Sequence, residues 1–166
     1  TQSALSVALP GDQIWVSSGT YLPSMVHGGT SNRYQSFQMK NDVEIYGGFP
    51  NAGSPSWDDR DWQANPTVLS GDIGTPNYAD DNCYHVFYHP NGLNLNNTAI
   101  LDGFTITLGN ADAGSILGAE RGGGMYNYYC SPTVKNCKFS NNSTIGIGGG
   151  MYNGFSNVNL ANCTFA

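Results

Sequence analysis

The sequence contains little charge. Lys and Arg together number 6 and Asp and Glu number 12, so charged side chains make up 11% of the 166 residues, against roughly 25% in an ordinary globular domain. No cluster of basic residues occurs, which excludes a nucleic-acid-binding surface. No apolar run approaches the roughly 20 residues of a membrane-spanning helix, which excludes a membrane span in this segment. The first residues also lack the basic start and long apolar core of a secretory signal.

Cysteine motifs for metal binding are missing as well. The four cysteines form no CxxC pair and no histidine lies at zinc-finger spacing, so we expect no structural zinc site. An even number of cysteines permits disulfides in an oxidising compartment. The 22 glycines, with Asn, Ser and Thr, supply turns and a neutral polar surface. Without a signal segment the chain is either cytosolic or the processed part of an exported protein, and this composition favours an extracellular or cell-surface location.

A repeat is the clearest pattern in the chain. GGGMYN occurs at residues 122–127 and again at 148–153, which places Met125 and Met151 26 residues apart. The same step relates Asn136 to Asn162, Cys137 to Cys163 and Phe139 to Phe165. A period of this length indicates a solenoid. Gly, Pro and Asn interrupt every window that could hold a helical repeat, whereas three short strands and three turns per unit fit one coil of a parallel β-helix.

Earlier units extend the pattern. The segments VLSGDI, LDGFTI, VKNCKF and LANCTF begin at Val68, Leu101, Val134 and Leu160. We align them as equivalent and attribute the longer first steps to loop insertions. The sequence therefore predicts an all-β fold, a right-handed parallel β-helix of about five coils, in which successive coils lie about 4.8 Å apart.

Stacking of like residues follows from this alignment. The aliphatic and aromatic columns, Phe139 and Phe165 among them, are predicted to point inward. Asn136 and Asn162 are predicted to form an amide ladder at a bend. Cys137 and Cys163 are predicted to be stacked thiols in a buried column. A disulfide between them is the alternative, because Cα atoms one coil apart lie near the lower end of disulfide separations.

The repeat resembles those of the chlamydial polymorphic outer membrane proteins, which carry GGA followed by an aliphatic residue, and FxxN. The corresponding segments here are residues 123–125 and 149–151, with Met as the apolar residue, and FSNN at residues 139–142. The stretches GDQIWVSSGTY and SFQMKNDVEIYGGF resemble the first coils of large secreted bacterial β-helix proteins. The resemblance implies a pectate-lyase-like β-helix with an adhesive or scaffold role in an outer-membrane, cell-surface or secreted protein.

Residues 1–166 are predicted to form a single β-helix domain. The last unit stops at Ala166, where the preceding unit continues with SNNST, so we expect a fragment of a longer chain with an open C-terminal coil. Two functions are carried forward. The first is a non-catalytic adhesin, stalk or self-assembling scaffold, with a carbohydrate or host-surface ligand and end-to-end self-association. The alternative is a carbohydrate-binding or carbohydrate-active β-helix, which leaves enzymatic activity open.

The segment WDDRDW at residues 57–62 is the best local candidate for a ligand site. Trp57 and Trp62 flank Asp59 and Arg60, a combination that suits sugar binding and, in a lyase, proton abstraction by the arginine. The structural interpretation is a loop in which Arg60 pairs with its own carboxylates and the tryptophans pack on the coil. We favour this second interpretation.

Three further groups have two interpretations each. Tyr126 and Tyr152 form an aromatic ladder for sugar rings if they face outward, and add to the core if they face inward. Asp72, Asp80 and Asp81 lie in a loop rich in oxygen donors that would suit Ca²⁺, or they form a solvated loop. His85 and His89 are expected to share one strand face, as a metal pair or as ordinary strand residues. No other cofactor is expected.

Overall fold

The computed structural model describes residues 1–114 and 118–166. Apart from the short helix α1 (Gln2–Val7) and three 3-10 turns, its regular structure consists of short strands. All pairings between the named strands are parallel, which confirms the predicted all-β, parallel class. No helix of the described residues is long and apolar enough to cross a membrane.

The strands form four sheets. The first sheet contains β1 (Gln13–Ser17), β3 (Glu44–Phe49), β6 (Ile100–Asp102), β10 (Thr133–Lys135) and β14 (Asn159–Ala161). The second sheet contains β2 (Gly19–Tyr21), β4 (Thr67–Ser70), β7 (Thr105–Thr107), β11 (Lys138–Ser140) and β15 (Thr164–Phe165). The third contains β5 (Phe87–His89), β9 (Met125–Tyr128) and β13 (Met151–Gly154), and the fourth pairs β8 (Asn110–Ala111) with β12 (Ser143–Thr144).

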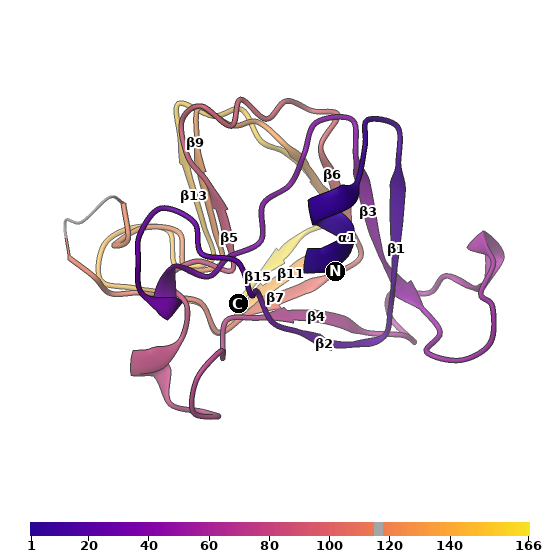
Figure 1. The fold of residues 1–166 in the computed structure, drawn as a ribbon, viewed down its shortest axis with the longest axis horizontal. Coiled ribbons are helices and arrows are strands. Elements are labelled where there is room, and N and C mark those ends of the chain that lie inside the picture. Colours follow the sequence, from indigo (N-terminus) through magenta and orange to yellow (C-terminus); the bar gives the residue numbers. More distant parts are fainter. Residues whose placement is uncertain (115–117) are drawn as a thin grey trace.

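The chain visits the sheets in a recurring order. From β10 in the first sheet it passes to β11 in the second, β12 in the fourth and β13 in the third, and then returns to the first sheet as β14. Residues one repeat apart therefore become direct partners on neighbouring strands. Met151 pairs with Met125, Leu160 with Val134, and Phe165 with Phe139. Figure 1 shows the first, second and third sheets arranged around a common interior.

One predicted alignment is wrong. Val68 was aligned with Leu101, but Val68 pairs with Thr105 in the second sheet, and Leu101 pairs with Ile45 in the first. The unit that precedes LDGFTI is thus VEIYGG followed by TVLS. Residues 50–66 separate its two strands and form a loop, called the inserted loop below. The 33-residue spacing that suggested the alignment joins residues of two different sheets.

The core is built from inward side chains of the first three sheets, apart from β14 and β15, whose residues are exposed. Ile45, Leu101 and Val134 from the first sheet face Leu69 and Ile106 from the second, and all are buried. Burying a side chain of this size contributes roughly 1.5–3 kcal/mol. Each added strand extends the same apolar column, so the core grows without a change in side-chain type.

The two ends of this core differ. At one end α1 lies across the interior (Figure 1) and buries Leu5 and Ala8 against the core. At the other end the last strands leave Leu160 42% and Phe165 48% exposed, although the Phe165 ring stacks on Phe139 at 4.8 Å. The apolar column is therefore covered on one side only.

The predicted amide ladder is confirmed, whereas the predicted thiol column is buried only in part. Cys137 is buried and Cys163 is half-buried, and both are free thiols in this structure. Burial raises the pKa of the Cys137 thiol. Asn162 Nδ2 donates to Asn136 Oδ1 at 2.7 Å. Both asparagines have a positive φ, 50° and 52°, a left-handed conformation that asparagine tolerates better than most residues.

Candidate functional site

The inserted loop leaves the molecule between the first and second sheets (Figure 1). Two of its acidic residues shape the loop itself. Asp59 accepts hydrogen bonds from the backbone N–H and the hydroxyl of Ser56, both at 2.8 Å. Asp61 accepts from the backbone N–H groups of Gln63 and Ala64. These bonds lower the pKa of both carboxyl groups, so the two side chains are charged caps of local turns.

Arg60 does not pair with the carboxylates of its own loop, contrary to the structural interpretation of WDDRDW. Its Nη2 lies 2.6 Å from Oδ1 of Asp102, at the end of β6. Arg60 also donates to the backbone carbonyls of Gly47 and Asp102, at 2.8 and 3.1 Å. Its side chain is only 9% exposed. The arginine therefore fastens the inserted loop to the first sheet, and a guanidinium has no lone pair that could accept a proton from a substrate.

Three aromatic rings surround this guanidinium. The rings of Tyr46, Trp57 and Trp62 lie 5.2, 5.4 and 5.3 Å from the Arg60 guanidinium carbon, within the range of cation–π attraction. The backbone of Trp62 passes so close to Gly48 that a Cβ there would lie 2.7 Å from it. Gly48 also has a φ of +98°. This glycine is what lets the loop press against the sheet.

A chain of polar side chains runs from Arg60 across neighbouring strands. Asp102 Oδ1 accepts from Arg60 and also from Nδ2 of Asn136, at 2.8 Å. Asn136 in turn accepts from Asn162. The order Arg60, Asp102, Asn136, Asn162 thus links the inserted loop to the predicted amide ladder. A partly buried chain of this kind is stable because each member is hydrogen-bonded.

A groove of about 360 Å³ lies beside this chain. Trp62, Asn136 and Asn162 line it. The lining also includes residues of the second sheet, where Lys138 pairs with Thr105 on β7 and with Thr164 on β15. Of these residues the sequence singled out only Trp62 as a ligand contact. Lys138 and the two threonines were not predicted as ligand contacts, although their position directly after the inward-facing Phe104, Cys137 and Cys163 column marks them as outward-facing.

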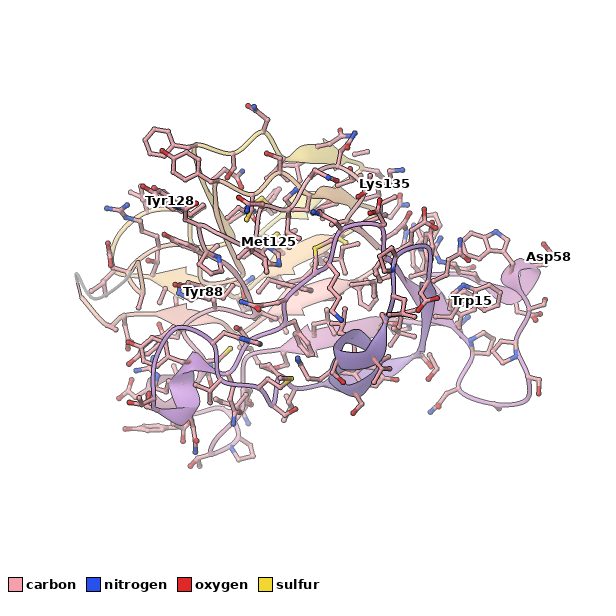
Figure 2. All side chains as sticks on the ribbon, turned by 45° about the horizontal axis from the view of Figure 1, so that its top comes forward. Trp15, Asp58, Tyr88, Met125, Tyr128 and Lys135 are labelled. Carbon is pink, nitrogen blue, oxygen red and sulfur yellow. The ribbon has the colours of Figure 1, made fainter. Side chains whose placement is uncertain are left out.

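Trp57 belongs to a different surface, on the other side of the inserted loop. Trp15 stacks on Phe49 with ring centroids 4.8 Å apart, and Trp57 lies 5.7 Å from Trp15. Trp15 and Trp57 are 42% and 44% exposed. Figure 2 shows Trp15 and Asp58 together at this protruding end of the molecule. The structure thus divides the predicted pair of tryptophans between two surfaces.

The tyrosines of GGGMYN differ in exposure: Tyr126 is covered and Tyr152 is half-buried. Met125 and Asn127 point into the core, so Tyr126 points to the outer face, where its ring stacks between Tyr88 and Tyr152 with centroids 5.3 Å away on each side. Tyr126 is only 7% exposed, and burial raises its pKa to about 12. Arg121 lies over the Tyr152 ring and donates to its hydroxyl. The covered Tyr126 presents no open platform to a sugar ring.

His85 and His89 do not share a face, because β5 begins only at Phe87. His89 lies inside, where Nδ1 is 2.7 Å from Asn127 Oδ1 and Nε2 accepts from the Met39 backbone N–H. His85 lies 3.0 Å from the Gly122 carbonyl through Nδ1, and its ring stacks on Tyr88. Burial lowers the pKa of each to about 4. Both are therefore neutral hydrogen-bonding residues of the structure at neutral pH.

The three candidate calcium ligands make local hydrogen bonds. Asp81 accepts from the Thr75 backbone N–H at 2.8 Å, Asp72 accepts from Asn77, and Asp80 accepts from the Tyr78 hydroxyl. In the part of the chain that the structure describes, no three Asp, Glu, His or Cys side chains converge as a metal site. Calcium binding by this loop stays a prediction.

Comparison with known protein families, with curated proteins and with solved structures finds no significant match for this chain.

Proposed function

We propose that the chain is a right-handed parallel β-helix of about five coils and acts as a non-catalytic module of a bacterial surface or secreted protein, as an adhesin, a stalk or a scaffold. The observation that carries this proposal is that the side chains with catalytic or metal-binding chemistry are hydrogen-bonded into the structure. Arg60, the candidate base of the carbohydrate-active alternative, and His89, one of the two candidate metal-binding histidines, both belong to hydrogen-bonded chains that run from strand to strand. Residues held in this way support the structure, which favours a non-catalytic role.

The second of these chains lies in the interior. His89 is bonded to Asn127, and Asn127 Nδ2 donates to Asn153 at 2.9 Å. Together with the Asp102, Asn136 and Asn162 chain, it connects successive units by side chains in addition to the backbone ladder. In a solenoid each unit contacts only its neighbours, so such bonds stiffen the rod along its length. Parallel strands joined by crossovers are right-handed in nearly all proteins, which supports the proposed handedness.

The test is a search for turnover. The purified chain is incubated with a panel of neutral and acidic polysaccharides, and newly formed reducing ends and unsaturated products are measured. The proposal expects no product above that of a heat-unfolded sample. Turnover that disappears in Arg60→Ala but persists in the exposed-loop control Asp58→Ala would overturn it. Labelling of intact producing cells with a membrane-impermeant reagent separately tests the surface location.

Carbohydrate binding is the second candidate. It is favoured by the exposed indoles of Trp15 and Trp57, held beside the buried Phe49 ring, since exposed aromatic rings of this kind suit the apolar faces of sugars. Glycan-array binding that falls in Trp57→Ala, at unchanged thermal stability, would support it. An array without binding for either protein would leave only the scaffold role.

A further inference from the structure

The groove lined by Trp62 and the second sheet contains side chains that suit a ligand. The hydrogen-bonded polar chains described above do not explain the presence of these side chains. The groove's volume of about 360 Å³ falls within the range of small-molecule sites. Its lining includes the indole of Trp62, two hydroxyls, from Thr105 and Thr164, and the amides of Asn136 and Asn162. An apolar ring together with several neutral hydrogen-bonding groups suits a molecule with one apolar and one hydroxylated face.

The charge of the groove is positive. Lys138 is the only ionisable cation among its lining residues, and no Asp or Glu lines it, although the whole chain carries a net charge of −6. The ion pairs of the described residues involve Arg33, Arg60 and Arg121 and leave the Lys138 ammonium without a carboxylate partner. Lys138 is exposed. It can therefore pair with a ligand anion without breaking an existing bond.

The amide chain also has a direction. Asn136 donates its Nδ2 to Asp102, and Asn162 donates its Nδ2 to Asn136. Each amide thus donates one hydrogen bond in the direction of Arg60, and Oδ1 of Asn162 is a hydrogen-bond acceptor. Because Asn162 is exposed and lines the groove, this oxygen can accept a hydrogen bond from a ligand hydroxyl. The fixed Arg60 and Asp102 pair holds the chain in that orientation.

We propose that this groove binds a pyranose that carries a carboxylate. Trp62 packs against the apolar C–H face of the ring, Lys138 pairs with the carboxylate, and Asn162 and Thr164 bind ring hydroxyls. No bond is made or broken in this binding. The inference goes beyond the proposed non-catalytic module, since it names a site and a class of ligand.

The experiment compares matched ligands. Binding of short oligomers of glucuronic acid, of the corresponding neutral glucose oligomers and of acetate is measured by titration calorimetry at low salt. We expect the glucuronate oligomers to bind about fivefold more tightly than the neutral ones, the effect of one exposed ion pair. Acetate, which lacks the ring, should not bind measurably. Equal binding of the two oligomers, or no binding of either, would overturn the proposal.

Matched variants locate the site. Lys138→Gln should remove the preference for the charged oligomer, and Lys135→Gln should retain it, because Lys135 lies on the first sheet, outside the groove. Thr164→Val is a second probe. It keeps the side-chain shape, removes the hydroxyl and should weaken the binding of both oligomers. Loss of the preference in Lys135→Gln as well would show unspecific charge attraction and overturn the site. Cleavage of the oligomer would instead contradict the non-catalytic function, so the two failures are distinguishable.

Discussion

Arg60 Nη2 and Asp102 Oδ1 lie 2.6 Å apart, although 42 residues separate them in the chain. This contact joins the inserted loop to the end of β6. Both side chains are almost buried, and Asp102 also accepts from Asn136. The pair thus connects three segments: the loop, the first sheet and the amide chain.

Removal of one partner of this pair should destabilise the fold. We expect Asp102→Ala to lower the free energy of unfolding by about 3 kcal/mol, because it leaves the Arg60 guanidinium nearly buried without its counter-ion. Urea denaturation followed by circular dichroism measures the change. Asp58→Ala, at an exposed position of the same loop, is the control and should stay within about 0.5 kcal/mol of the parent. Equal losses of unfolding free energy in the two variants would contradict the stabilising role of the Arg60 and Asp102 pair.

Stability should fall in mild acid because of the two buried histidines. The pKa of His85 and of His89 is lowered from 6.5 to about 4, so between these pH values the unfolded chain binds protons that the folded chain does not. The histidine contribution is therefore complete above pH 6.5 and is lost as the pH falls toward 4, with a slope of up to about 1.4 kcal/mol per pH unit for each histidine.

Urea denaturation at a series of pH values measures this slope. His89→Gln should reduce it by the share of one histidine, whatever the effect of the substitution on absolute stability. His27→Gln is the comparison, since His27 is only partly buried and should change the slope less. An unchanged slope in His89→Gln would show that carboxyl groups alone cause the acid sensitivity.

The amide ladder should separate a backbone effect from a hydrogen-bond effect. Asn162 has a φ of 52° and donates to Asn136. Asn162→Ala loses the hydrogen bond and also places alanine in the left-handed region, which asparagine tolerates better, at a cost of about 2 kcal/mol in all. Asn162→Gly loses the bond but not the backbone preference, so we expect about half that cost. Thermal unfolding of the two variants side by side checks the order, and the reverse order would contradict it.

The open end of the core should cause limited self-association. Leu160 and Phe165 expose apolar surface at one end, whereas α1 covers the other. Light scattering over a range of concentrations should show dimers and no longer particles, because only one end can pair. Leu160→Asp should give monomers, and Val7→Asp, an exposed change at the covered end, should not. Particles that grow beyond dimers would instead support the end-to-end assembly expected from the sequence.

The 26-residue step of the sequence was sufficient for the parallel class and for the stacked columns. In a parallel, in-register sheet a residue and its equivalent one unit later are direct neighbours, so Met125 and Met151, or Phe139 and Phe165, had to meet once the class was known. Asn136 and Asn162 could be predicted as a ladder for the same reason. These relationships need only local periodicity, which the sequence contains in full.

The tertiary structure alone decided the rest. Where residues 50–66 fold back determines that Val68 pairs with Thr105, that Arg60 meets Asp102 and that Trp57 and Trp62 face different surfaces. Stacking between Tyr88 and Tyr152 likewise covers Tyr126, although it points outward. An insertion has no periodicity. Its contacts depend on segments outside it, such as Gly48, which has a positive φ, and β6. The Lys138 groove exists only because that insertion forms its second wall.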